Sequence, residues 1–522
     1  MSLSKSILMK NRLILFLASL LIATSSCYKE DPPFLSDENL FITDEGVKTA
    51  VNGIYSSVAG FTYYSSDLIQ LTNFHSGMFQ SSRNQDQNGI ASLNPLPNLT
   101  FVENVWKSSY TSINRANSTI QGIKEFQAEP SETVLNELGQ THFLRALVYF
   151  NLVRLYGDIP LRLESVDSET LHAPRVATDS IYTVIIDDLK IAEANLYENG
   201  LQTIGRPAKE AANMLLAQVY MTLAGNEGSG SPYWEMAKEE ALKVYGKYTL
   251  VSDFNSLWES GSRNNNTESI FEIQYNQANS GNVIRLHTPS NAFIGQSWGR
   301  IMLNPEVIDA HQSQYPNDPR FEATVMYNYM KYNADGSEAG EQKIYPLAAR
   351  TSKARAFPFV AKHWITDPKT PTPYSDANFV VMRYGELLLM LAEITNEVDG
   401  PAAAEIYVNE VISRARNSAG GDGIAPENWA GLSQDEFRQR IMREYQYELL
   451  GEGGAWYRNR RRGLDYFKTE VIDVHNNRIA EDGFQDFDLL YENPEKAMLL
   501  PIPMAEINTN LEINADDQNP GY

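Results

Sequence analysis

The chain has 522 residues, of which 43% are hydrophobic and 21% are charged, so it can bury a large core without disulfide or metal cross-links. Its 66 acidic residues outnumber 43 lysines and arginines, which gives a formal net charge of −23. This excess of negative charge argues against nucleic acid and anionic lipid headgroups as main partners. The single cysteine, Cys27, excludes an intrachain disulfide framework and a cysteine-based zinc site.

The first 26 residues have the layout of a secretory signal. Basic residues come first, and the apolar run 13–22 and several small residues follow them. The run is too short to span a bilayer. Cys27 stands at the cleavage point, so we predict a lipoprotein signal over 1–26 and a lipid on Cys27 as the first mature residue. An ordinary cleaved signal followed by an incidental cysteine is the alternative.

Helical periodicity dominates the mature chain after a polar, proline-containing tether at 27–42. Apolar residues recur at three- and four-residue spacing over 44–60, where Thr43 can cap the first turn, and over 101–127. The stretch 138–156 is apolar nearly all round, so we expect it to be a central buried helix. Further helices are predicted over 179–197, 207–224, 232–246, 384–397, 401–417 and 433–451.

Two pairs of these helices carry small residues that permit close packing. Leu215–Tyr220 is followed in the next helix by Ala237 and Ala241, and Leu388–Glu393 is followed by Ala404. The pattern is similar to tetratricopeptide helix pairs, with unrelated helical hairpins as the alternative. We therefore predict a mainly α fold on a tetratricopeptide-like scaffold of helix pairs. The residues expected to be buried between its helices are Leu147, Phe150, Leu216, Ala217, Leu389 and Ala392.

Two segments interrupt the helical pattern. Residues 61–98 mix aromatic and polar side chains with Gly and Pro, which predicts a long loop. Residues 247–383 contain short β-like runs near 270–275 and 379–383 among many Asn, Gly and Pro. No flexible hinge borders the second segment, so we interpret both as excursions from a single domain that spans 43–522.

No motif is found in the context that catalysis or metal binding needs. Gly295–Gly299 matches the G-x-S-x-G motif of serine hydrolases, but Pro289 and Pro305 flank it where a strand and a helix are required. The seven histidines lack metal-ligand spacing, and Asn333–Gly336 lacks the spacing of a calcium loop. We therefore predict no catalytic residue, no metal and no cofactor.

Three acidic residues in and just after the predicted helix 433–451 share one helical face. Glu444, Glu448 and Glu452 are spaced four residues apart, which places them in a row. Carboxylates arranged in this way repel one another unless basic side chains pair with them. The basic run 460–462 is the partner that we expect, so this pattern predicts a structural ion-pair network.

A series of short motifs runs in order along almost the whole mature chain. They are Gly53-Ile54-Tyr55, Trp106 with Asn114-Arg115-Ala116-Asn117, Phe143-Leu144-Arg145-Ala146, Arg154-Leu155-Tyr156-Gly157-Asp158-Ile159-Pro160-Leu161, Gly205-Arg206, Arg383-Tyr384, Leu389 to Glu393, Leu499-Leu500-Pro501-Ile502-Pro503 and Asn519-Pro520-Gly521-Tyr522. In these motifs the chain resembles the SusD/RagB family of outer-membrane nutrient-binding lipoproteins. The residues Tyr28 to Asp31 also resemble the signal that sends such lipoproteins to the cell surface.

The resemblance implies a tetratricopeptide-like protein that is not an enzyme. It implies a lipid-anchored position on the extracellular face of the outer membrane, as a lid on a SusC-like TonB-dependent transporter. Oligosaccharides are the cargo that we expect, and oligopeptides on the same scaffold are the alternative. A surface hydrolase is a third hypothesis, which the lack of a catalytic motif disfavours.

The family's ligand site is built from loops that differ between members, so we sought candidates in the residues themselves. A sugar ring needs an aromatic face for its C–H groups and Asn, Asp or Arg for its hydroxyls. Trp298 is the first candidate, because Gly295 and Gly299 leave its face uncrowded. The alternative is that such aromatics pin loops to the scaffold. The other candidates are Arg300, Trp364, Tyr63, Tyr64, Asn73, Phe74, His75, Arg83, Asn84 and Asp86.

Overall fold

The structure is a computed structural model of the whole chain. It describes residues 37–81, 89–166, 169–278, 281–289, 292–295, 297–346, 357–364, 367–482, 490 and 494–522. The predicted signal peptide, Cys27 and residues 28–36 of the tether lie outside the described residues.

The described chain begins with two helices that pack on the scaffold. They are α2 (Asp37–Phe41), at the end of the predicted tether, and α3 (Asp44–Val58). Thr43 caps α3 as predicted, because its side-chain oxygen accepts a hydrogen bond from the Gly46 amide at 3.1 Å. Phe41 is buried against Gly122 of helix α6 (Thr100–Phe126), which fastens α2 to the scaffold.

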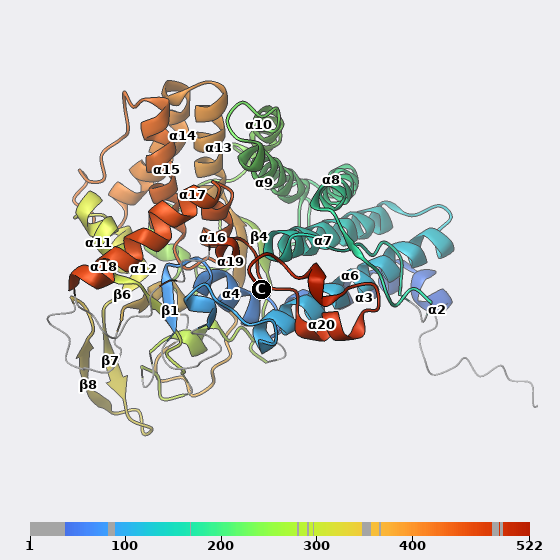
Figure 1. Cartoon of the computed structure of the whole chain (residues 1–522), viewed down its shortest axis with the longest axis horizontal. Coiled ribbons are helices and arrows are strands. Elements are labelled where there is room, and N and C mark those ends of the chain that lie inside the picture. The colour runs from blue at the N-terminus through green and yellow to red at the C-terminus, as the bar shows by residue number, and fades with distance from the viewer. Residues whose placement is uncertain are drawn as a thin grey trace, which may run out of the picture.

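Every helix that the periodicity predicts is present, and consecutive helices pack as pairs (Figure 1). The pairs that confirm the tetratricopeptide-like scaffold are α6 with α7, α7 with α8, α9 with α10, and α13 with α14. The six residues expected between helices are at most 2% exposed. The bounds are α7 (Glu132–Tyr156), α8 (Thr178–Asn195), α9 (Lys209–Glu227), α10 (Tyr233–Val244), α13 (Tyr384–Val398), α14 (Pro401–Asn417) and α15 (Gln434–Leu449).

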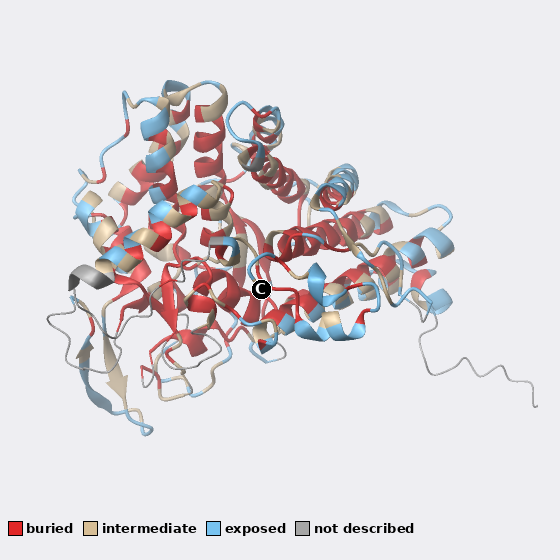
Figure 2. Cartoon of the chain, in the orientation of Figure 1, coloured by how far each residue is buried: buried red, intermediate tan, exposed pale blue. Residues whose placement is uncertain are grey.

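Helix α7 is buried along almost its whole length, as Figure 2 shows. Its polar side chains therefore need partners inside the protein. Arg145 donates to Asp188 of α8 at 2.7 and 2.8 Å, and a ring nitrogen of His142 lies 2.7 Å from the same carboxylate. These bonds allow a helix with polar residues to occupy the centre of the core.

Short antiparallel strands and small helices complete the fold. The predicted β-like runs form β4 (Ser269–Ile273) and β10 (Phe379–Arg383), which pair with each other. A four-stranded sheet has the order β1 (Phe79–Ser81), β5 (Ile301–Leu303), β9 (Phe359–Val360), β6 (Val325–Met326). The hairpin of β7 (Asn328–Tyr332) and β8 (Glu338–Lys343) projects from one end (Figure 1), and β2 (Ile159–Pro160) pairs with β3 (Arg175–Val176). The small helices are α11 (Pro305–Gln314), α12 (Arg320–Thr324), α16 (Ala455–Arg460), α17 (Leu464–Phe467), α18 (Asp473–Asp482), α19 (Pro494–Met498) and α20 (Met504–Thr509).

The prediction of one continuous loop over 61–98 is wrong. This segment contains helix α4 (Asp67–Phe74) and strand β1. Every residue of α4 is buried, polar ones included, so the helix lacks the one-sided apolar pattern by which a surface helix is predicted. One apolar core joins α4, the strands and the scaffold helices.

The acidic row of α15 does form an ion-pair network, which confirms that prediction. Glu448 is fully buried and accepts hydrogen bonds from Arg383 at 2.6 Å, from Arg320 at 3.1 Å and from Arg414. Arg320 also donates to Glu444 at 2.7 Å. All three arginines lie far from α15 in the sequence.

The prediction that the basic run 460–462 pairs with that row is wrong. Gly451 and Gly453 have φ of +85° and +84°, so the chain turns away after α15 before it reaches the run. Arg461 then pairs with Glu393 of α13, at 2.7 Å for one of its two bonds. Glu452 instead accepts a hydrogen bond from the Lys362 ammonium at 2.7 Å.

Candidate ligand-binding site

Trp298 lies in a loop that hydrogen bonds fasten to the 3-10 helix η2 (Ile284–His287). Its backbone N–H donates to a carbonyl of that helix at 2.6 Å, and the Gly299 amide donates to the Thr288 carbonyl at 2.8 Å. The Ser297 hydroxyl also donates to the Thr288 carbonyl, at 2.7 Å. The serine of the G-x-S-x-G match therefore holds the loop in place.

The two glycines beside Trp298 are needed by the backbone of the loop. A Cβ on Gly295 would lie 2.1 Å from the carbonyl oxygen of Pro371, and Gly299 has a φ of +60°. The indole itself is partly exposed, and the guanidinium carbon of Arg300 stands 3.9 Å from its centroid. One face of Trp298 is therefore covered by Arg300, so the expectation of an uncrowded face does not hold for that side.

A buried carboxylate of α4 lies close enough to Arg300 to feel its charge. Asp67, the first residue of α4, is 1% exposed and accepts a hydrogen bond from the Asn104 carboxamide at 2.8 Å. Burial raises the pKa of Asp67 to about 6, although Asn104 and the charge of Arg300 oppose that shift. Burial also lowers the pKa of Arg300.

The two predicted ligand segments contact each other near this loop, because the backbone amide of Val283, next to η2, donates to the Ser65 hydroxyl at 3.3 Å. Asp67 itself is only 1% exposed. Trp298 and Arg300 come from one segment and Asp67 from the other. Sequence reasoning missed Asp67 because it missed α4. The residues Ser65-Ser66-Asp67 before an apolar run are a helix-start signal that could have indicated it.

Five candidates from 61–86 lie in the core, with at most 5% of each exposed. They are Tyr63, Tyr64, Asn73, Phe74 and His75. The Tyr64 hydroxyl accepts from Asn151 at 3.0 Å, and the His75 ring lies 4.5 Å from that of Trp456. Burial lowers the pKa of His75 to about 4. These buried positions favour the alternative interpretation, in which such side chains pack their segment onto the scaffold and do not contact a ligand.

The remaining candidates are Trp364 and three residues that lie outside the described ranges, Arg83, Asn84 and Asp86. Trp364 is partly exposed, and its ring centroid lies 4.5 Å from that of Phe293. Trp364 thus contacts the loop that leads into Trp298. Over the described ranges, no group of three or more His, Cys, Asp or Glu side chains is arranged to hold a metal ion.

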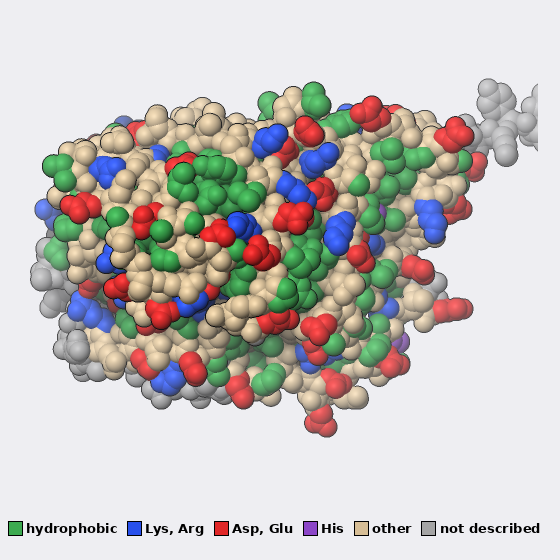
Figure 3. Space-filling view, turned by 90° about the horizontal axis from the view of Figure 1, so that it is seen from above, with side chains coloured by type: hydrophobic (Ala, Val, Ile, Leu, Met, Phe, Trp, Pro, Cys, Tyr) green, Lys and Arg blue, Asp and Glu red, His purple; other side chains and the backbone are tan. Residues whose placement is uncertain are grey.

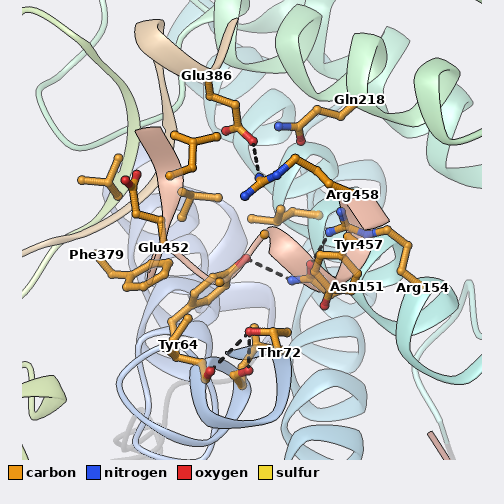
Figure 4. Close-up of a pocket in the computed structure, with 18 of the residues that line it drawn as sticks. Tyr64, Thr72, Asn151, Arg154, Gln218, Phe379, Glu386, Glu452, Tyr457 and Arg458 are labelled. Carbon is orange, nitrogen blue, oxygen red and sulfur yellow. Dashed lines mark hydrogen bonds and ion pairs between the residues drawn. The ribbon is translucent and has the colours of Figure 1, made fainter. Parts of the chain in front are cut away.

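Two larger concavities and one cleft lie elsewhere on the scaffold. A cavity of about 530 Å³ is lined by polar residues around Arg206, and a groove of about 500 Å³ between α6 and α20 is lined by Trp106 and Tyr110. The cleft opens between α7, α9, α13 and α16 (Figure 4). On the face in Figure 3, acidic and basic side chains are interspersed, so no large area of one sign marks a site there.

None of the helices that the structure describes is both long and apolar enough to span a bilayer.

Comparison with known proteins supplies relatives along the whole chain. The SusD-like proteins P25 and P2 of Formosa agariphila are 24% and 26% identical, and each alignment covers 98% of this chain and 100% of the relative. The starch-binding protein SusD of Bacteroides thetaiotaomicron is 31% identical over 134 residues, which are 25% of this chain and 23% of that protein.

Solved structures share the fold. A SusD homolog from Bacteroides thetaiotaomicron has a TM-score of 0.80 at 22% identity, and the match covers 93% of this chain and 98% of that one. A laminarin-binding SusD-like protein has a TM-score of 0.68 at 21% identity, with 92% and 99% covered. Residues 40–221 match the family described as starch-binding and associating with the outer membrane, and residues 267–522 match the SusD family. The chain therefore belongs to the SusD-like (SusD/RagB) family.

Proposed function

We propose that the protein captures oligosaccharides at the cell surface and delivers them to a SusC-like TonB-dependent transporter. Family membership supports this proposal, as do a relative named as starch-binding and a structural neighbour named as laminarin-binding. The outer-membrane association of the matched family supports the location. A lipid on Cys27 would hold the protein on the extracellular face.

The arrangement around Trp298 is the observation that carries the glycan proposal. The indole offers an apolar face for the C–H groups of a sugar ring, and Arg300 fixes the indole by stacking on it. Arg300, which is partly exposed, can donate to a sugar hydroxyl. Aromatic and polar groups that converge in this way are typical of small-molecule sites.

We also propose that the protein binds its cargo without chemical change. The hydroxyl of Ser297, the one side chain in a hydrolase-like motif, is engaged with backbone carbonyls of its own loop. A serine nucleophile needs a free hydroxyl beside a general base.

Calorimetric titration of the mature chain against panels of oligosaccharides and oligopeptides tests the proposal. Stacking contributes on the order of 1–3 kcal/mol by analogy with base stacking, so Trp298→Ala should weaken glycan binding at least fivefold. Its melting temperature should stay nearly unchanged, because Trp298 is not in the core. Tyr332→Ala, an aromatic truncation on the β7–β8 hairpin, is the control and should keep full affinity.

Two results would contradict the glycan proposal. Binding of peptides with no binding of glycans would assign oligopeptide cargo to the same scaffold. Lost stability with unchanged affinity in Trp298→Ala would make Trp298 a structural pin. Delivery is tested separately, by purifying the lipidated chain from native outer membranes. A SusC-like transporter should copurify, and its absence would count against that partner.

A further inference from the structure

The cleft between the scaffold and α16 brings polar side chains of four helices together. Its cavity volume is about 80 Å³, and a second space of about 60 Å³ shares six of its lining residues. This volume accommodates a few non-hydrogen atoms or several waters. The polar groups that the argument uses are Arg154 of α7, Gln218 of α9, Glu386 of α13, and Tyr457 and Arg458 of α16.

Arg154 brings a positive charge to the cleft wall without an acidic partner. Its guanidinium is held between two rings, 3.7 Å from the centroid of Phe150 and 3.8 Å from that of Tyr457. It donates to the Phe150 carbonyl at 3.0 Å and to the Asn151 carboxamide oxygen at 2.7 Å. Within the described part of the chain, no carboxylate forms an ion pair with it, and burial lowers its pKa.

Arg458 reaches into the cleft (Figure 4), and within the described ranges its one ion-pair partner is Glu386. One of its nitrogens lies 3.3 Å from Glu386, and the two side chains are 12% and 16% exposed. Burial lowers the pKa of Arg458 and raises that of Glu386, so neither charge is fully compensated by the other. The other carboxylate in the wall, Glu452, is already engaged by Lys362 and Arg383.

Further groups around the cleft add donors and positive charge. Among the described residues, the buried Tyr457 hydroxyl has no hydrogen-bond partner, which is uncommon for a buried polar atom. Behind the wall, Arg460 donates to the backbone carbonyls of Arg154 and Met498, and burial lowers its pKa to about 10. Apart from Arg383 and Glu452, which pair with each other, the charged groups that line the cleft among the described residues are two arginines, Arg154 and Arg458, and one carboxylate, Glu386, in a chain whose net charge is −23.

We propose that this cleft binds a small carboxylate, either as a free anion or as the carboxylate of a uronate sugar. A carboxylate matches the planar guanidinium of Arg458, can approach Arg154, and accepts a hydrogen bond from the Tyr457 hydroxyl. The excess of positive charge disfavours a cation and gives a neutral ligand no advantage. The site is separate from Trp298 and does not depend on the proposed glycan platform.

Titration of the mature chain with sodium acetate and sodium glucuronate, at ionic strength held constant with sodium chloride, tests the proposal. Binding is followed by calorimetry and by the rise of the melting temperature that a native-state ligand causes. Saturable binding is expected. Arg458→Gln should weaken it at least tenfold and Tyr457→Phe about threefold, whereas Trp298→Ala should leave it unchanged.

Arg440→Gln is the matched control, because it removes one arginine charge from an exposed position on α15 and should bind as the wild type does. Tighter binding of glucuronate than of acetate identifies the uronate source, and equal or weaker binding identifies the free anion. The proposal is overturned if the wild type binds neither probe saturably, or if both cleft variants keep full affinity. Tyr457→Phe decides the matter if Arg458→Gln does not fold.

Discussion

Glu448→Gln is the substitution that best tests how the ion-pair network holds the fold. The carboxylate of Glu448 is fully buried and faces Arg320, Arg383 and Arg414. Glutamine keeps the shape of the side chain and removes its negative charge. Three buried guanidinium groups then lose one anionic partner, and the amide turns donors toward them.

The magnitude follows from what each arginine retains. Breaking a buried ion pair by removal of one partner costs about 3–5 kcal/mol, because a charge is left uncompensated. Each arginine here keeps a second carboxylate, so we expect the lower end, about 3 kcal/mol. The retained partners are Asp318 and Glu444 for Arg320, Glu268 and Glu452 for Arg383, and Glu268 for Arg414.

Calorimetric unfolding at pH 7 measures the effect. An unfolding entropy of about 2.1 cal/mol/K per residue gives about 1 kcal/mol/K for this chain, so the melting temperature should fall by about 3 °C. Glu239→Gln, at an exposed position on α10, is the matched control and should change stability by less than about 0.5 kcal/mol. A melting temperature of Glu448→Gln within 1 °C of the wild type would refute the reasoning.

The pH dependence gives a second check on the same variant. The arginines hold the pKa of Glu448 well below its ordinary value, although burial alone would raise it. The stabilisation is therefore complete above the unfolded-state pKa of about 4.3 and is lost only as the pH falls below it. The difference between wild type and Glu448→Gln should be largest near pH 7 and should shrink in acid. A difference that grows toward pH 3 would contradict the assigned charge state.

Three further predictions concern Asp67, Gly122 and Cys27. Burial raises the folded-state pKa of Asp67 to about 6 from about 3.9, so its charge destabilises the fold above pH 6 and not below about pH 4. Asp67→Asn should therefore be more stable than the wild type at pH 7.5, by up to about 3 kcal/mol in the free energy of unfolding. Melting curves recorded over a pH series should show this difference disappear near pH 4. Gly122→Ala should weaken the packing of α2 by about 1–3 kcal/mol, because the added Cβ would lie 2.3 Å from the Phe41 ring. Faster proteolysis near residue 41 would show this effect. Labelled palmitate should enter the wild type and not Cys27→Ala, and equal labelling of both would exclude the lipid anchor.

Local patterns predict the scaffold well because each of its helices buries a continuous apolar face. The helix over 401–417 and its partner over 384–397 follow from their own residues, and the structure packs them against each other. Helix α4 escapes the same reasoning, since a short helix that is buried all round has no polar face to set its period.

Contacts between distant segments are what sequence patterns do not supply. The acidic row indicates that basic partners are required, but it does not identify them. Arg320 lies 124 residues before its partner Glu444, and Arg414 lies 34 residues before its partner Glu448. The same holds for Ser65, whose hydroxyl accepts a hydrogen bond from the Val283 amide across 218 residues. Only the folded chain brings such groups together, so the nearest basic run was a misleading choice.

The positions of the network's cations connect it to the ligand platform. Arg320, Lys362 and Arg383 all belong to the segment 247–383, and each pairs with a member of the acidic row Glu444, Glu448 and Glu452. Lys362 lies two residues before Trp364, which packs on the loop that leads to Trp298. A buried ion pair adds little net stability, because desolvation offsets most of its attraction, but its geometry is specific. We infer that the network fixes where this loop-rich segment sits on the scaffold, so that the aromatic platform is already in place when cargo arrives and less ordering opposes binding.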